Sequence, residues 1–232
     1  MRAFIVLYRA FRSSPPAARL HTLIRFLTSP MLRVVDQLPR GGSLLDIGAG
    51  HGVLAVLARE RVARVVAVEP DVRKVLGVRQ LAAALECGSS LPLEAQASLR
   101  TPQRRQAAAL HFVIGYDDVV RGSFDAISII DVLYKIPTAQ WDAVLARAAS
   151  RLKPGGMLII KEMDPTERLK NRWNRTQERL ASLLGLTLGE SFSYEAPAEF
   201  IARLGRHGFE ARAQRIDAWY PHPHLLYVAR LI

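Results

Sequence analysis

The sequence has a single cysteine and no long apolar run, and both absences limit what the protein can be. With only Cys87 among 232 residues, the chain forms no internal disulfide, which is typical of proteins in the reducing cytoplasm. No apolar run reaches the roughly 18 residues that a membrane-spanning helix needs. The length suits one sizeable domain, 50% of the residues are hydrophobic, and we find no internal repeat. We therefore expect one globular, cytoplasmic domain.

Acidic residues are scarce relative to basic ones. The 32 lysines and arginines exceed the 21 acids, and the formal charge is +11. Such an excess is typical of proteins that bind nucleic acid or an anionic membrane, and it also occurs in arginine-rich proteomes. The imbalance is strongest in residues 1–40, where seven arginines and one acid, Asp36, are interleaved with apolar residues. The pattern predicts two basic amphipathic helices. They would form a cap over the domain, lie as an interfacial helix on a membrane, or do both.

The rest of the chain is organised around residues 43–71. An apolar strand leads into three glycines within five residues, a segment with helical apolar spacing follows, and a second apolar run closes on Glu69. Strand, glycine turn, helix, strand and acid form the pattern of a nucleotide-binding βαβ unit. Glycine suits the turn because it tolerates positive φ and lets a ligand approach the backbone closely. A tight turn that binds nothing is the alternative.

The glycine spacing distinguishes between two kinds of nucleotide. A dinucleotide site needs a third glycine where the chain has Val53, whereas here the pattern is G-x-G-x-G after Asp46. This pattern resembles motif I of the class I S-adenosylmethionine-dependent methyltransferases, and Glu69 matches the acid that binds the ribose in that family. An acid at position 46 would favour the cationic methionine end of the cofactor, while the helix N-terminus receives its carboxylate. The cofactor-binding residues that the resemblance implies here are Asp46, Gly48, Ala49, Gly50, Glu69 and Pro70.

Two later strand ends extend the resemblance. After the strand expected at residues 111–114, the family commonly places an acid that binds adenine. This chain has Tyr116 there, so Asp117 becomes the candidate, with a simple turn aspartate as the alternative. The segment SFDAISIIDVLYKIP, residues 123–137, resembles the fourth-strand motif of the family. Asp131 is then expected below the methionine portion of the cofactor, or as an N-cap of the following turn.

The resemblance implies an α/β fold, with a doubly wound, mostly parallel seven-stranded sheet, an antiparallel last strand and a helical N-terminal cap. The expected parts are a basic helical segment at 1–40, the methyltransferase domain at 41–232, an insert at about 86–107 and a substrate lid at about 164–192. A solvent-facing basic helix is the alternative to the lid. Residues 209–220 and 225–231 should pair as an antiparallel hairpin at the edge of the sheet.

The implied reaction is attack of an acceptor on the sulfonium methyl group, and an acceptor that carries a proton needs a nearby base. Tyr134, Glu162 and His222 are the candidate catalytic residues, because they lie at expected strand ends or turns. A simple turn histidine is the alternative for His222. Together with His224 it is also spaced like a two-histidine metal site, but no cysteine or carboxylate cluster completes such a site, so we predict no metal.

Signatures of a macromolecular acceptor are missing. No Asn-Pro-Pro-Tyr-type tetrad follows the fourth strand, Cys87 lies in the insert rather than at a strand end, and no RNA-binding module is appended. We therefore predict a small-molecule or lipid acceptor, with the N-terminus weakly favouring a substrate at an anionic membrane surface. An RNA methyltransferase that uses the +11 charge and a non-catalytic binding protein with this fold are the alternatives.

Overall fold

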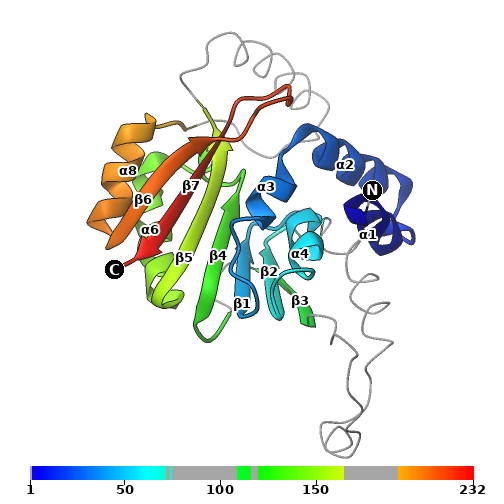
Figure 1. Ribbon diagram of the computed structural model, residues 1–232, viewed down its shortest axis with the longest axis horizontal. Helices are drawn as coiled ribbons and strands as arrows, with labels where there is room; N and C mark the ends of the chain where they lie inside the picture. The colour runs from blue at the N-terminus through cyan, green and yellow to red at the C-terminus, as the bar shows by residue number, and fades with distance from the viewer. Residues whose placement is uncertain (1, 72–73, 75–108, 116–119, 165–192) are drawn as a thin grey trace, which may run out of the picture.

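The computed structural model describes residues 2–71, 74, 109–115, 120–164 and 193–232, which build one seven-stranded sheet flanked by helices (Figure 1). The strand order is β3-β2-β1-β4-β5-β7-β6. Neighbouring strands from β3 to β5 are parallel, whereas β7 is antiparallel to both β5 and β6. The predicted doubly wound sheet with an antiparallel last strand is therefore confirmed. The strands are β1 (Ser43–Ile47), β2 (Arg64–Glu69), β3 (Ala109–Ile114), β4 (Phe124–Ile130), β5 (Leu152–Met163), β6 (Phe209–Arg215) and β7 (His224–Leu231).

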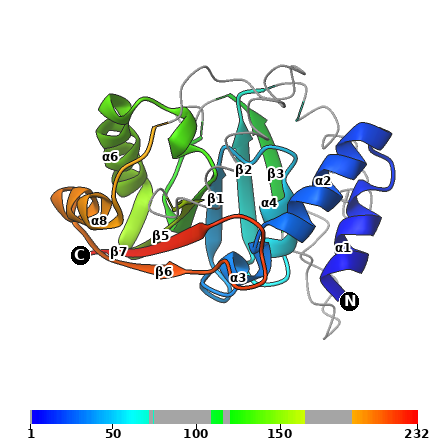
Figure 2. The same cartoon turned by 90° about the horizontal axis from the view of Figure 1, so that it is seen from above.

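Helices cover both faces of the sheet (Figure 2). Successive residues of a strand point to opposite faces, so a strand that is apolar throughout needs a helix layer on each side. Leu44 belongs to the core layer under α1, α3 and α4, whereas Leu45 belongs to the layer under α6 and α8. Helix α2 lies beside α1 and extends toward the carboxyl ends of the parallel strands (Figure 1). The helices are α1 (Arg2–Phe11), α2 (Pro16–Thr28), α3 (Met31–Val35), α4 (Val53–Ala58), α6 (Trp141–Arg151) and α8 (Pro197–Arg206).

The C-terminal hairpin is shorter than the sequence predicts. Its first strand was expected to reach Tyr220, but β6 ends at Arg215. The chain leaves the ladder here because Arg33 of α3 donates to the carbonyl oxygens of Ile216 (2.7 Å) and Ala218 (3.3 Å). Two prolines later in this loop also lack the N–H group that a strand needs. The loop is thereby held beside α3.

Two predicted parts lie in undescribed segments of the chain. The insert at about 86–107 lies outside the described residues, and so does the lid at about 164–192 apart from Asp164. Within the described ranges, no helix combines the length and the apolar character that crossing a membrane demands.

Candidate functional site

The glycine turn joins β1 to α4 at the carboxyl edge of the sheet. Gly48 and Gly50 have φ angles of 71° and 58°, in the left-handed region that favours glycine. A Cβ atom at Gly48 would lie 2.4 Å from Cγ2 of Val132, whereas one at Gly50 would meet no atom within 4 Å. Gly48 is therefore required for packing against the loop after β4, and Gly50 faces open space that a ligand can fill.

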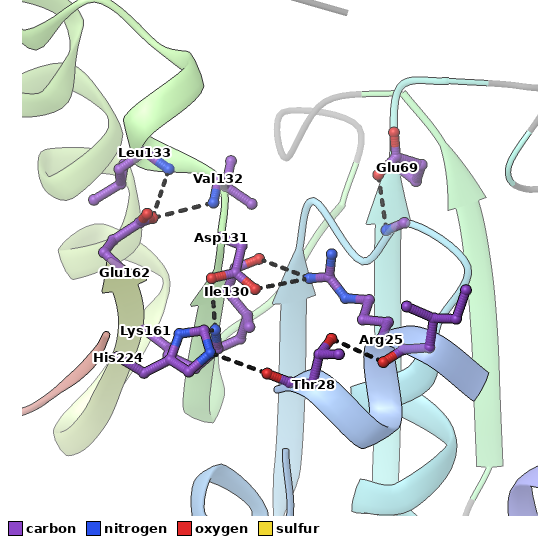
Figure 3. A network of polar contacts seen from close by, with 12 residues as sticks. Arg25, Thr28, Glu69, Ile130, Asp131, Val132, Leu133, Lys161, Glu162 and His224 are labelled. Carbon is purple, nitrogen blue, oxygen red and sulfur yellow. Dashed lines mark hydrogen bonds and ion pairs between the residues drawn. The ribbon is translucent and has the colours of Figure 1, made fainter. Parts of the chain in front are cut away.

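Glu69 ends β2 with its carboxylate held against the glycine turn (Figure 3). Its Oε2 accepts from the Gly50 N–H at 2.8 Å, and its Oε1 accepts from the Asp71 N–H at 3.0 Å. The Lys74 ammonium lies 3.7 Å from Oε1. Because a carboxylate oxygen has two acceptor sites, Glu69 can hold the turn and still accept hydrogen bonds from a ligand hydroxyl. Pro70 follows it on the surface.

Asp46, near the end of β1, is buried with one oxygen unsatisfied. Its Oδ1 accepts from the Ser128 hydroxyl at 2.7 Å, while Oδ2 has no hydrogen-bond partner in the described part of the chain. Burial, with a smaller contribution from Glu69, raises the pKa of Asp46 to about 7. A ligand cation or hydrogen-bond donor beside Oδ2 would stabilise the ionised form. The glycine turn thus lies between two acids: Glu69, which is suited to accept from hydroxyl groups, and Asp46, which is suited to a positive charge.

Asp131 follows β4 and forms a partly buried ion-pair network (Figure 3). Its Oδ1 lies 2.6 Å from Lys161 Nζ, and its Oδ2 lies 3.2 Å from Arg25 Nη2 of α2. Burial opposes ionisation, but these two cations outweigh it and hold the pKa of Asp131 well below its ordinary value. The turn after it is capped at Val132 without a side-chain bond, so the N-cap alternative for Asp131 is wrong.

Lys161 and His224 extend this network to the last strand and to α2. Lys161 is fully buried, and burial lowers its pKa while Asp131 opposes that shift. Its ammonium lies 3.3 Å from His224 Nδ1, and His224 Nε2 lies 3.3 Å from the Thr28 carbonyl oxygen. Burial lowers the pKa of His224 to about 3, so the ring is neutral, and this geometry assigns its proton to Nε2. Strands β4, β5 and β7 are thereby tied to the N-terminal helices.

Glu162 lies on the opposite face of β5 and enters a small pocket beside the loop after β4. Its Oε1 accepts from the N–H groups of Val132 (3.1 Å) and Leu133 (2.8 Å), while Oε2 is buried with no partner among the described residues. Burial, with the nearby charge of Asp131, raises the pKa of Glu162 to about 8. The pocket is lined by Leu133, Tyr134, Trp141, Glu162, Met163, Ser193, Tyr194, Glu195, Phe200 and Tyr227.

The pocket brings together two of the three candidate catalytic residues. Tyr134 stacks on Tyr194 with ring centroids 6.3 Å apart, and both rings line the same pocket as Glu162. His222 lies in the loop between β6 and β7 and is not among the lining residues. Asp117 lies outside the described residues.

Sequence reasoning missed several residues of this site. Arg25 gives no local signal, because an arginine at a helical spacing looks like any solvent-facing one. For His224 the sequence indicates only a spacing with His222, typical of strand neighbours on one face or of a two-histidine metal site. Lys161 was not missed in the same way, because the sequence places it with Glu162 as a charged pair at the carboxyl end of a strand, where site residues collect; only its partners were unknown.

Comparison with known proteins places this geometry among methyltransferases. The model of the methyltransferase-domain family matches residues 19–217. No curated protein sequence matches the chain.

Solved structures share the fold at low identity. One chain of the complex between the Haloferax volcanii Trm112 methyltransferase activator and a methyltransferase is 15% identical, with a TM-score of 0.65 and coverage of 92% of this chain and 93% of that one. Magnesium protoporphyrin IX methyltransferase from Synechocystis PCC 6803, with bound S-adenosylhomocysteine, is 18% identical, with a TM-score of 0.60 and coverage of 99% and 94%. The Burkholderia thailandensis 1,6-didemethyltoxoflavin-N1-methyltransferase is 18% identical, with a TM-score of 0.61. The match covers 90% of this chain and 80% of that one.

Proposed function

The chain belongs to the methyltransferase-domain family and is a class I S-adenosylmethionine-dependent methyltransferase, and we propose that its acceptor is a small molecule or lipid bound beside Tyr134 and Glu162. The observation that carries the proposal is the buried Oε2 of Glu162, which has no hydrogen-bond partner among the described residues and lies in an aromatic pocket. The aromatic and apolar side chains that line the pocket suit a small-molecule or lipid acceptor.

The residues around the glycine turn fit the cofactor. Glu69 would accept the two ribose hydroxyls, and the unsatisfied Oδ2 of Asp46 would face the cationic methionine end. The open space at Gly50 would admit the nucleoside close to the backbone. When bound, S-adenosylmethionine supplies an electrophilic methyl group on a sulfonium sulfur. The chain itself contributes alignment and exclusion of water.

Glu162 is positioned to take the proton of the acceptor. Its two backbone hydrogen bonds fix the carboxylate against Val132, the same residue whose Cγ2 abuts Gly48. We propose that Oε2 accepts the proton while the acceptor oxygen or nitrogen forms its bond to the methyl carbon. The methyl group would leave the sulfonium sulfur of the bound cofactor, and the electron pair of the carbon–sulfur bond would remain on that sulfur. Tyr134 and Tyr194 would hold the body of an aromatic or apolar acceptor by stacking.

The acceptor class is tested by following a labelled methyl group. Purified protein is incubated with methyl-labelled S-adenosylmethionine and a cell extract that is split into a small-molecule, a lipid and an RNA fraction. We expect label in the small-molecule or lipid fraction, because aromatic and apolar side chains line the pocket. Label that is confined to RNA and released by ribonuclease would contradict the proposal and support the nucleic-acid alternative.

A further inference from the structure

The exposed apolar surface of the protein is concentrated on the N-terminal helices. Among the described residues, ten large hydrophobic side chains are exposed, and eight of them lie between residues 4 and 32. A single exposed leucine needs no explanation, but a cluster of this size marks an interaction surface. The eight residues are Phe4, Ile5, Tyr8, Leu20, Leu23, Ile24, Leu27 and Leu32.

Helix α2 carries its apolar stripe on the outside. Leu20, Leu23, Ile24 and Leu27 follow the i, i+3, i+4, i+7 spacing of one helix face, and their exposed fractions run from 37% to 61%. The only buried residue within α2 is Thr22. A groove of about 570 Å³ continues this surface between α2 and α1, lined mainly by apolar side chains of both helices. An ordinary surface helix would bury such a stripe, so this one faces a partner.

The charge around the stripe indicates what that partner is. Residues 2–35 contain six arginines and no acid. Arg9 on α1, Arg12 in the turn after it and Arg19 on α2 are all exposed. A second copy of the chain that docks through the same face would place the arginines of both copies close together. A two-fold contact joins identical surfaces, so it offers no acids to offset this repulsion. An anionic lipid surface offers both an apolar layer and negative charge.

We propose that α1 and α2 dock the protein on an anionic membrane surface, with the apolar stripe of α2 entering the interface between headgroups and acyl chains. The docking goes beyond methyl transfer and does not depend on it. The loop between β6 and β7 offers a second anchor, because Trp219 is fully exposed there. Arg33 binds this loop to α3, and Figures 1 and 2 show it beside the α2–α3 end of the molecule.

The docking helix also borders the candidate site. Arg25 lies one residue from the stripe and pairs with Asp131, and the Thr28 carbonyl oxygen meets His224. A membrane-bound protein would thus present the carboxyl edge of its sheet near the lipid. We infer that the acceptor is an amphipathic molecule that reaches the pocket from the bilayer, and this part rests on the proposed function.

Vesicle flotation tests the docking without any methyl transfer. We expect the full chain to float with phosphatidylcholine vesicles that contain phosphatidylglycerol, more weakly with phosphatidylcholine alone, and less as salt rises. The double variant Leu20→Asp/Leu27→Asp should lower binding at least about tenfold, because it removes apolar contact and adds repulsion. Both positions are exposed, so folding should be unchanged, which a thermal melt checks. Ile232→Asp alters a still more exposed residue that lies outside the N-terminal helices, and this variant should bind like the unmodified protein.

Three results would overturn the docking proposal. One is the absence of binding to the anionic vesicles, and another is equal binding by the double variant. The third is a dimer in light scattering that Leu20→Asp/Leu27→Asp dissociates, which would assign the stripe to a second copy. Normal vesicle binding with label only on water-soluble acceptors would overturn the lipid acceptor alone. A failure of docking would leave the proposed methyl transfer intact.

Discussion

Replacing Glu162 by glutamine is expected to lower kcat about a hundredfold to ten-thousandfold and to leave the affinity for S-adenosylmethionine nearly unchanged. Glutamine keeps a carbonyl oxygen that can accept from the N–H groups of Val132 and Leu133, so the loop after β4 should keep its position. What it loses is the basic oxygen at Oε2, which would take the acceptor proton. Single-turnover kinetics with an accepted substrate, together with cofactor titration, measure the two effects separately.

The pH dependence of the same reaction tests whether Glu162 is the base that takes the acceptor proton. Burial raises the pKa of Glu162 to about 8, and a base works only when ionised. The rate should therefore rise with pH up to about 8 and then level off, and Glu162→Gln should remove this rise. Glu195→Gln is the matched control, because Glu195 lines the same pocket but is paired with Arg203 at 2.9 Å. A Glu162→Gln enzyme that keeps the rate and its pH profile would exclude Glu162 as the base.

Replacing Asp131 by asparagine is expected to lower the free energy of unfolding by about 3 kcal/mol, measured on the cofactor-free protein by denaturant titration. Asparagine keeps the shape of the side chain and tolerates the φ of 57° at this position. It removes the charge that compensates the fully buried ammonium of Lys161. A buried cation without its partner is the costly case, because water cannot reach it.

Repeating Asp131→Asn in a Lys161→Met protein separates the contribution of the Asp131–Lys161 ion pair from other effects of the substitution. In Lys161→Met, the change Asp131→Asn should cost less than half as much, because the buried cation is gone. Lys153→Met is the surface control, since Lys153 pairs with Asp125 at 2.8 Å but is about half exposed. It should cost less than about 1 kcal/mol. Equal costs of Asp131→Asn in both backgrounds would show that the network does not stabilise the fold.

The parts that follow local rules could be predicted from the sequence. Glycine spacing, apolar strands and the acid at Glu69 depend on near neighbours in the chain, and the structure places the glycine turn and β2 where they predict. The end of β6 could not be found this way, because Arg33 binds that loop from 183 residues away. A contact between distant segments cannot be predicted from the local sequence pattern of either segment.

The same limit explains what was missed at the site. The pairing of Arg25 with Asp131 spans 106 residues, and only the folded chain shows which face of α2 meets β4. Periodicity alone predicts that the N-terminal helices are amphipathic, but it leaves open whether their apolar side faces the domain or a membrane. The structure instead exposes Leu20 and Leu27, so the direction of the stripe is a tertiary property.

Calorimetric titration with S-adenosylmethionine and S-adenosylhomocysteine tests the central claim most directly, namely that the glycine turn and Glu69 bind the cofactor. We predict micromolar affinity, about −8 kcal/mol, for the unmodified protein and at least about tenfold weaker binding for Glu69→Ala, which loses charged hydrogen bonds to the ribose. Glu60→Ala is the control, since Glu60 pairs with Arg2 rather than with the turn, and its affinity should be unchanged. Equal affinities of the unmodified protein and a folded Glu69→Ala, or no binding by the unmodified protein, would contradict the account.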